Sequence, residues 1–339
     1  MEYFRPIAMT DPARPAQALT LAGGWCWFDR LEVMSRTAAP RIIDAADCPA
    51  DVLGRLTAPR ADFAGLVLDR PRLMGILNVT PDSFSDGGRF ASIEAAAQQG
   101  RQIAKLAEIV DIGGESTRPG AQEVPVAEEI ARTVPVIEAL RAGGMPGPIS
   151  IDTRKAMVAA AALRAGATLV NDVSGLAFDP AMGPLVAREG VPLVLMHAKG
   201  VPSTMQDDPR YGDVVLDVYD DLDRRLTLAV AAGIDRSRIA IDPGIGFGKS
   251  ADHNLALIRD LAVLHGLGCP ILLGASRKRF IGSIGRAEAA SARMPGSVTV
   301  ALAGLAQGAQ ILRVHDAAET RQALLLWQAL NTDHLEGRA

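Results

Sequence analysis

From residue 71 onward, short runs of apolar residues alternate with longer stretches in which apolar residues recur at helical spacing. There are eight such runs, and each ends in polar residues. They are "LMGILNV" to Asn78, "EIVDIGG" to Glu115, "PISID" to Asp152, "TLVNDVSG" through Asn171 and Asp172, "VPLVLMH" to His197, "IAIDPG" to Asp242, "PILLGAS" before Lys278, and "AQILRVH" to His315. The pattern predicts eight buried strands, each of which delivers polar side chains at one end.

The stretches between these runs predict helices. Their ranges are 92–107, 126–142, 154–165, 181–189, 213–232, 252–265, 298–308 and 317–331. A strand followed by a helix eight times predicts an α/β fold of the (β/α)8 TIM-barrel type, and residues 71 to about 335 match its typical length. A doubly wound open sheet gives the same alternation and remains the alternative. In either fold the strands' carboxyl ends share one face, so the polar residues should converge there.

Residues 1–70 lack this alternation, and we treat them as a non-barrel N-terminal extension that precedes a barrel over residues 71–339. The extension holds six of the fourteen aromatic residues, including Trp25, Trp27 and Phe28. Disordered tails are poor in aromatic residues, so we expect the extension to fold against the barrel. The segment "IGRAEAASARMPG", residues 284–296, is interpreted as a mobile or variable loop.

Composition excludes several classes of protein. The chain has 35 Lys and Arg against 39 Asp and Glu and no long basic run, so neither nucleic acid nor an anionic membrane is an expected partner. Three scattered cysteines, Cys26, Cys48 and Cys269, argue against a disulfide framework and structural zinc. The N-terminus does not resemble a signal peptide, and no apolar stretch is long enough to span a membrane. We therefore expect a cytoplasmic protein.

The glycine-rich stretch "DPGIGFGKS", residues 242–250, does not have the spacing of a nucleotide-binding loop. A P-loop needs glycine where this chain has Pro243, and the glycines at 244, 246 and 248 do not follow the Rossmann pattern. These glycines instead suit a backbone that approaches a flat ligand closely.

Three of the strand ends offer hydrogen-bonding groups for a planar heterocycle. One carboxylate of Asp152 or Asp242 can accept two parallel N–H groups, and the Asn171 amide can serve a neighbouring donor and acceptor. The set suits a pterin or purine-like ring. Two structural alternatives stay open: Asp152 and Thr153 could cap the next helix, and Asp242 could serve only the turn before Pro243.

Cationic groups also gather at the strand ends. They are Arg118, Lys278, Arg313 and His315. Together they predict a site for a phosphate ester or a diphosphate, although any one of them could be an ordinary surface residue. His197 is interpreted as a core or rim histidine, because no paired metal-ligand spacing accompanies it and protein-held zinc is not expected.

Eight motifs occur in an order that resembles the dihydropteroate synthase family. They are "GILNVTPDSFSDGG", "DIGGESTRPGA", "SIDT", "VNDVSG", "LMH", "DPGIGFGK", "GASRKRF" and "RVHD", and they span most of residues 71–335. The resemblance implies a TIM barrel that condenses 6-hydroxymethyl-7,8-dihydropterin diphosphate with 4-aminobenzoate, giving 7,8-dihydropteroate and diphosphate for folate synthesis. It also implies Mg²⁺, a homodimer and competition by sulfonamides.

The resemblance assigns roles residue by residue. Those implied for the pterin site are Asp152, Asn171, Asp242 and Lys278, with Met196, Phe247 and Ser276 as further substrate-binding residues. Those implied for the diphosphate region are Arg313 and His315, with Asn78 as the Mg²⁺ ligand. Those implied for two closing loops are Phe84 and Asp86 in the first and Thr117, Arg118 and Pro119 in the second. The expected catalytic residues are Asp152, Asp242, Lys278, Arg313 and His315. Arg279 stands where many relatives have a small hydroxyl residue.

The chemistry independently favours such a transfer. Loss of diphosphate from a methylene on an electron-rich pterin leaves a delocalised cation, so charge placement replaces a covalent nucleophile. Three alternatives remain: a pterin-dependent methyltransferase, a non-catalytic or regulatory pterin-binding barrel, and an aldolase that uses Lys278 as a Schiff base.

Overall fold

Eight parallel strands form the centre of the molecule. The computed structural model describes residues 1–79, 88–116, 121–200 and 209–331. The strands are β6 (Arg72–Asn78), β7 (Ile109–Gly113), β8 (Ile149–Asp152), β9 (Leu169–Asp172), β10 (Leu193–Met196), β11 (Ile239–Asp242), β12 (Leu272–Leu273) and β13 (Ile311–Val314). They pair in the order β11-β10-β9-β8-β7-β6-β13-β12, and a parallel bridge between Ile241 and Ile271 joins the two ends. The sheet therefore closes into a barrel, which confirms the predicted fold and makes the open-sheet alternative wrong.

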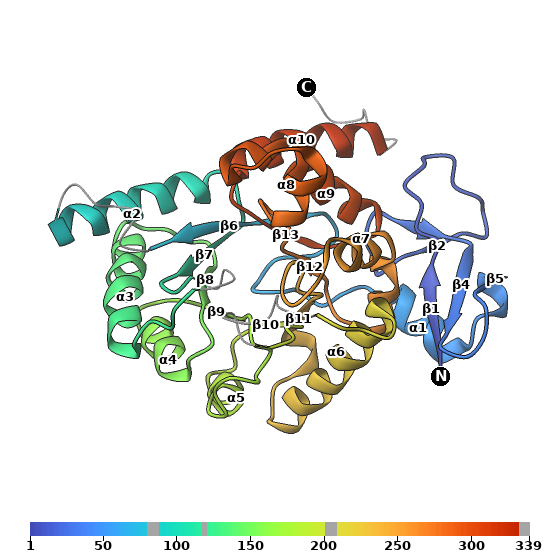
Figure 1. Ribbon diagram of the computed structural model, residues 1–339, viewed down its shortest axis with the longest axis horizontal. Coiled ribbons are helices and arrows are strands. Elements are labelled where there is room, and N and C mark those ends of the chain that lie inside the picture. Colours follow the sequence, from blue (N-terminus) through green and yellow to red (C-terminus); the bar gives the residue numbers. More distant parts are fainter. Residues whose placement is uncertain (80–87, 117–120, 201–208, 332–339) are drawn as a thin grey trace.

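Helices surround the barrel (Figure 1). They are α2 (Gly88–Ala104), α3 (Val126–Ala142), α4 (Ala156–Arg164), α5 (Met182–Glu189), α6 (Val214–Ala231), α7 (Ala251–Arg259), α9 (Met294–Ala306) and α10 (Ala317–Asn331). The largest departure from prediction follows β11, where one helix was expected over 252–265. Here α7 ends at Arg259 and a 3-10 helix, η4 (Leu261–Leu267), follows. All seven η4 residues are buried, so this segment packs on several sides and does not have the single apolar face of an amphipathic α-helix.

The segment predicted as a loop, residues 284–296, is partly helical. Helix α8 (Arg279–Gly285) runs into its start, and a 3-10 helix, η5 (Ala290–Arg293), leads into α9. The Arg293 guanidinium donates to the carbonyl oxygens of Ala287 at 3.0 Å and Arg277 at 3.1 Å. The segment is therefore a loop only over residues 286–289, and one arginine ties it to the region after β12. Its mobility and variability remain predictions.

The amino-terminal end of the barrel is closed by residues 59–70. Phe63 and Leu66 form a small antiparallel bridge, and Phe63 and Leu68 are almost fully buried. They pack with one interior residue from each of seven barrel strands, namely Met74, Ile109, Leu169, Val194, Ala240, Leu272 and Ile311. This part of the extension is thus an apolar plug beneath the barrel.

The rest of the extension forms a small β-rich layer at one side of the barrel (Figure 1). Its elements are an antiparallel sheet of β1 (Glu2–Pro6), β4 (Arg30–Ser35) and β5 (Arg41–Asp44), a ribbon of β2 (Leu19–Thr20) and β3 (Trp27–Phe28), the 3-10 helix η1 (Ala45–Asp47), and α1 (Ala50–Thr57). Phe28, Leu31 and Leu56 are fully buried within it. Phe28 therefore belongs to a separate small core, against which Trp25 also packs.

Hydrogen bonds join this layer to the outer helices of the barrel. The Tyr3 hydroxyl donates to the Asp220 carboxylate of α6 at 2.8 Å, and the Trp25 indole donates to the Leu305 carbonyl of α9 at 2.9 Å. Arg55 donates to the Gly266 carbonyl of η4 at 3.1 Å. The extension thus packs against three consecutive parts of the barrel wall.

Candidate active site

The residues at the barrel mouth, most of them polar, lie two positions beyond the apolar residues that meet the plug. Side chains two apart on a strand point to the same face, so both sets face the barrel interior. The pairs are Ile109 with Asp111, Leu169 with Asn171, Val194 with Met196, Ala240 with Asp242, and Ile311 with Arg313. The strand ends predicted from the sequence therefore converge on one mouth.

Arg313 joins three of these strands. Its Nε donates to Oδ2 of Asp111 and its Nη2 donates to Oδ2 of Asp152, both at 2.6 Å. The Asn171 amide also donates to Oδ2 of Asp111, at 3.2 Å. Asp111 was missed in the sequence, where the signal was one carboxylate inside the otherwise apolar run "EIVDIGG".

Two oxygens of this cluster are left without a hydrogen-bond partner among the described residues. They are Oδ1 of Asp111 and Oδ1 of Asp152, and both are buried. Burial is the main cause that raises the pKa of Asp152 to about 7, against the opposing charge of Arg313. A buried acceptor without a donor is costly, so Asp152 is suited to receive N–H groups from a bound ring.

Asp242 divides its two oxygens between the fold and the mouth. Oδ1 accepts from the Gly244 backbone N–H at 2.7 Å, as the turn alternative predicted. A Cβ built on Gly274 would lie only 3.3 Å from Oδ2, so the absence of a side chain there leaves this oxygen room. Burial raises the pKa of Asp242 above its ordinary value. The turn accounts for one oxygen, and the described residues offer no hydrogen bond to the second.

The glycine-rich stretch after β11 is held by a lysine that sequence reasoning overlooked. Lys249 is buried, donates to the carbonyls of Gly244 at 2.9 Å and Phe247 at 3.1 Å, and lies 2.8 Å from Nδ1 of His197. Gly244 has φ +67, and a Cβ there would meet the His197 carbonyl oxygen at 1.8 Å, so only glycine fits. Lys278 Nζ lies 4.0 Å from the centre of the Phe247 ring. Phe247 and Lys278 are thereby brought together.

His315 and Ser276 meet beside this pair. His315 Nδ1 lies 3.1 Å from the Ser276 hydroxyl, and the His315 backbone N–H donates to the same oxygen at 3.2 Å. Burial, followed by the charges of Arg313 and Arg277, lowers the pKa of His315 to about 3. The expectation of a cationic His315 is therefore wrong for this structure, where the imidazole is neutral near pH 7.

The chain is similar to proteins of a known family. The family model described as "Pterin binding enzyme" matches residues 74–315. The chain belongs to this family. A dihydropteroate synthase of Synechocystis sp. is 45% identical over 262 residues, which cover 77% of this chain and 90% of that protein. The predicted family and the predicted class of transferase are thereby confirmed.

Solved structures of dihydropteroate synthases agree with this assignment. The Xanthomonas albilineans enzyme with 4-aminobenzoic acid is 49% identical, with a TM-score of 0.76 over 81% of this chain and 99% of that chain. A second structure, of the same enzyme with 7,8-dihydropteroate, is 46% identical, with a TM-score of 0.73 over 81% of this chain and all of that chain.

Several residues that the family resemblance assigned to the two closing loops cannot be placed. They are Phe84, Asp86, Thr117, Arg118 and Pro119, which lie outside the described residues. The base of the second loop is described, however. Glu115 accepts from Arg154 at 3.0 Å and from Lys155 at 2.8 Å, and Lys155 also donates to Glu129 at 2.7 Å.

The start of helix α4 shows whether Asp152 caps this helix. Helix α4 begins at Ala156 with Lys155 as its N-cap residue, whose own side chain makes no cap hydrogen bond. The Ala156 backbone N–H instead donates to the Asp179 carboxylate at 2.8 Å. Thr153 instead donates to Glu129 at 2.7 Å. Asp152 is therefore not a helix cap in this pterin-binding enzyme, and its carboxylate faces the cluster around Arg313.

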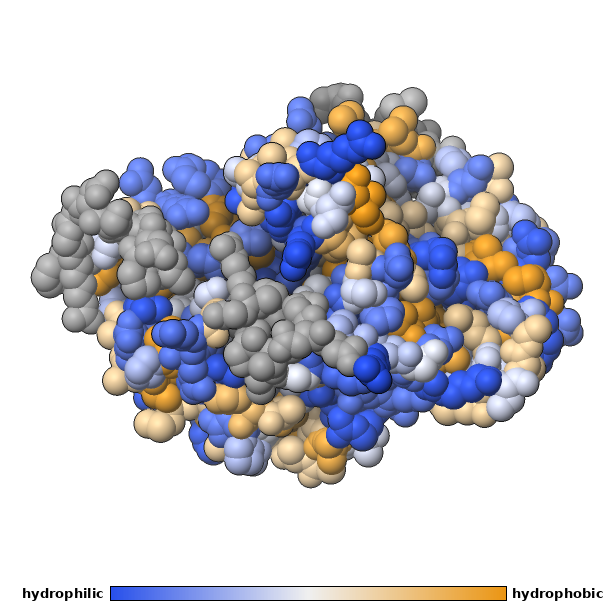
Figure 2. Space-filling model, in the orientation of Figure 1, coloured by the Kyte–Doolittle hydropathy of each residue, from blue (hydrophilic) through white to orange (hydrophobic). Residues whose placement is uncertain are grey.

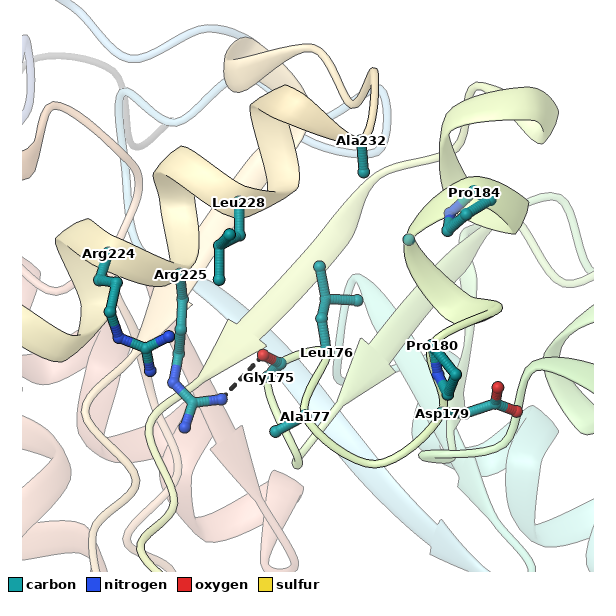
Figure 3. Close-up of a pocket in the computed structure, with 11 residues that line it drawn as sticks. Gly175, Leu176, Ala177, Asp179, Pro180, Pro184, Arg224, Arg225, Leu228 and Ala232 are labelled. Carbon is teal, nitrogen blue, oxygen red and sulfur yellow. Dashed lines mark hydrogen bonds between the residues drawn. The ribbon is translucent and has the colours of Figure 1, made fainter.

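A cavity of about 210 Å³ lies on the outer wall, between α5 and α6 (Figure 3). Arg225 forms one side of it and donates to the carbonyls of Ser174 at 2.7 Å and Gly175 at 2.8 Å. A Cβ on Gly175 would meet the Met196 carbonyl oxygen at 2.3 Å. Arg225 thus supports the turn after Asn171 from outside, and this cavity is separate from the mouth.

The residue expected to bind a metal ion, Asn78, lies at the edge of the mouth. Asn78 ends β6 with an exposed side chain. Within residues 1–79, 88–116, 121–200 and 209–331, no three His, Cys, Asp or Glu side chains are grouped to hold a metal ion. None of the helices in these ranges has the length and hydrophobicity needed to cross a membrane.

Proposed function

We propose that the enzyme joins 4-aminobenzoate to 6-hydroxymethyl-7,8-dihydropterin diphosphate and releases 7,8-dihydropteroate and diphosphate. The observation that carries this function is the set of buried acceptors at the mouth, in which Asp152 and Asp242 each keep one oxygen for a ligand. Related structures hold 4-aminobenzoic acid or 7,8-dihydropteroate, which are one substrate and the product of this reaction.

The reaction needs no covalent intermediate with the protein. The bond between the pterin methylene carbon and the diphosphate oxygen breaks, and the oxygen leaves with the electron pair. The amine nitrogen of 4-aminobenzoate then bonds to that carbon and loses one proton to water. Positive charge develops on the pterin in between, and the carboxylates of Asp152 and Asp242 stabilise it electrostatically.

The other residues of the mouth orient the substrates in this proposal. Met196, which is buried at the end of β10, and Phe247 provide apolar contacts for the ring. Lys278 holds its ammonium group 4.0 Å from the centre of the Phe247 ring and would attract the leaving diphosphate. Neutral His315, held by Ser276, would donate a hydrogen bond to a diphosphate oxygen rather than supply a charge.

Mg²⁺ belongs to this proposal as an ion that arrives with the diphosphate. The Asn78 amide oxygen is the kind of ligand that Mg²⁺ accepts, and its exposure at the strand end suits a site completed by phosphate oxygens and water. Bound Mg²⁺ would neutralise charge on the leaving group. We expect EDTA to abolish turnover and added Mg²⁺ to restore it; full activity in metal-free buffer would contradict this part of the proposal.

The decisive experiment supplies the dihydropterin diphosphate, 4-aminobenzoate and Mg²⁺ and measures dihydropteroate and released diphosphate. Binding of the pterin substrate without turnover would favour the non-catalytic barrel. Methyl transfer from a methylpterin would favour the methyltransferase. Irreversible loss of activity with borohydride and a carbonyl substrate would favour the Lys278 aldolase. Sulfonamides should raise the KM for 4-aminobenzoate, because their sulfonyl group mimics its carboxylate.

The proposed state of the protein is a cytoplasmic homodimer. Helix α10 leaves Leu325, Leu326 and Leu330 exposed, and Figure 2 shows a few hydrophobic side chains among hydrophilic ones at the top of the molecule, where this helix lies. Such a surface is typical of a protein interface. The three cysteines are free and buried, which suits a reducing compartment. Sedimentation of the protein should give twice the chain mass, and Leu326→Glu should shift it towards the monomer.

A further inference from the structure

We propose that Asp111 is a positioning residue for the pterin site: it locks Arg313 and Asn171 from below, so that Asp152 and Asn171 keep their acceptor oxygens for the ring. This inference rests on the proposed function and extends it to a residue that does not touch the substrate. Asp111 lies in the middle of β7 and is fully buried.

The strand register places Asp111 one layer beneath the ring-binding groups. Asp152 pairs in register with Gly113 on one side and Asn171 on the other, so these three positions form one layer at the mouth. Asp111 is two residues before Gly113 on the same face and pairs in register with Ser150. Asp111 therefore acts through its neighbours rather than by direct contact with a ring.

Asp111 controls how Arg313 uses its hydrogen bonds. Because Asp111 accepts from Nε, only Nη2 of Arg313 is shown to reach Asp152, through a single oxygen. Arginine and a carboxylate readily form two parallel hydrogen bonds when nothing competes. Without Asp111, Arg313 could take both oxygens of Asp152, including the Oδ1 that the ring would need.

Asp111 also fixes which way the Asn171 amide points. A carboxylate only accepts hydrogen bonds, so the Asn171 atom 3.2 Å from Oδ2 must be the Nδ2 donor. The amide oxygen of Asn171 is consequently directed away from Asp111 and is presented as an acceptor. An asparagine at position 111 could either accept from Nδ2 of Asn171 or donate to its Oδ1, and would release this constraint.

The charge of Asp111 has a separate consequence for Asp152. The charged groups that act on Asp152 are Arg313 on β13, Asp111 on β7, Glu129 on α3 and Asp172 on β9; Asp242 on β11 acts on Arg313. Arg313 favours the ionised form of Asp152, whereas the three carboxylates disfavour it. Neutralising position 111 should therefore make Asp152 ionise at lower pH.

The test compares Asp111→Asn with the unchanged protein across pH. We expect kcat/KM for the pterin substrate to fall about 10- to 100-fold at pH 8, mainly through KM, because small misplacements of binding groups are costly. The acid limb of the pH profile should move to lower pH, and the KM for 4-aminobenzoate should stay the same. A residue with only a structural role would leave the acid limb where it is.

Two controls keep the result interpretable. Ser150→Ala changes a buried residue in the same layer, whose hydroxyl has no partner among the described residues, and should alter neither kinetics nor the pH profile. In a double-mutant cycle, Asp111→Asn and Arg313→Lys should be non-additive, since the first acts through the second.

A binding measurement tests the same inference without turnover. In calorimetry, the affinity of Asp111→Asn for the pterin substrate should be lower than that of the unchanged protein.

Each other outcome overturns the inference. Native kinetics, or an unshifted acid limb, in folded Asp111→Asn would show that the residue does not position the site. If Asp111→Asn is not folded by circular dichroism, Asp111→Ser replaces it, and failure of both to fold would make Asp111 structural. An inactive wild-type protein would instead contradict the proposed function, so the two failures are distinguishable.

Discussion

The two ends of the barrel are built on the same strands but from opposite kinds of residue. At the amino-terminal end, interior residues such as Ile109 and Ile311 are fully buried against Phe63 of the plug. Two positions further on, Asp111 and Arg313 face the same interior and pair with each other. The plug end of the barrel interior is thus packed with apolar side chains, and positions nearer the mouth hold charged groups.

The difference shows that residues at one end of the barrel stabilise the fold, whereas residues at the other end are available to bind a ligand. At the plug end, Phe63 and Leu68 cover the apolar interior residues, so truncation of these side chains should lower the free energy of unfolding. The mouth keeps buried oxygens of Asp111 and Asp152 that find no partner in the described part of the chain, which costs stability and is typical of a binding site that a ligand completes. Four predictions follow from this contrast, in order of decreasing effect.

Phe63→Ala should produce the largest effect, and only on stability. Phe63 is fully buried and meets the apolar interior layer, so truncation should lower the free energy of unfolding by about 3–5 kcal/mol. Urea unfolding measures this loss. At a temperature where the variant is folded, kcat/KM should remain near that of the unchanged protein; a large kinetic loss would mean that the two ends are not independent.

Asp242→Asn should show the reverse pattern. Asparagine keeps an oxygen for the Gly244 N–H, so the turn and the melting temperature should be preserved. At the free oxygen, a donor would replace an acceptor opposite the ring N–H groups and the charge would be lost. We expect a loss of at least about 3 kcal/mol, or roughly a hundredfold, in kcat/KM for the pterin substrate. Native kinetics would remove Asp242 from the site.

A third measurement follows the pH dependence of stability without substrate. The pKa of Asp152 is raised from 3.8 to about 7 in the folded protein, so the folded state binds more protons than the unfolded state between these values. The resulting stabilisation is complete below about pH 4 and is lost as pH rises to about 7, by at most about 1.4 kcal/mol per pH unit. Asp152→Asn should remove this contribution, and an equal slope in both proteins would contradict it.

The smallest effect is expected outside both ends, in the extension. Tyr3→Phe removes the hydrogen bond to Asp220 but keeps the ring against Tyr219, whose centre is 5.2 Å away. The free energy of unfolding should fall by about 1 kcal/mol, with no change in kcat/KM. A kinetic change in this variant would indicate that the extension influences the mouth.

The barrel and much of its mouth were predictable from sequence because both depend on local order. Asp152, Asn171 and Asp242 each end an apolar run, and the ends of parallel strands share one face. Asp111 was not predictable in the same way. It lies within its run, and its partner Arg313 is 202 residues away.

Other features depend on packing that no local pattern encodes. The neutral state of His315 follows from burial and two neighbouring arginines. The buried Lys249 was hidden within a motif considered for its glycines. The place of the extension depends on contacts such as that of Trp25 with Leu305, 280 residues apart, in a region without helical or strand periodicity.

The plug has a consequence for how the chain can be assembled. Phe63 and Leu68 leave the ribosome before any barrel strand, yet seven strands supply the surface that buries them, the last being β13. The first apolar segment of the barrel region to be made is therefore among the last to find its complete binding surface. Until Ile311 has been synthesised, Phe63 and Leu68 remain partly exposed on the nascent chain and could associate with other apolar surfaces. We therefore expect the protein to depend on chaperones more than a barrel without residues 59–70 would.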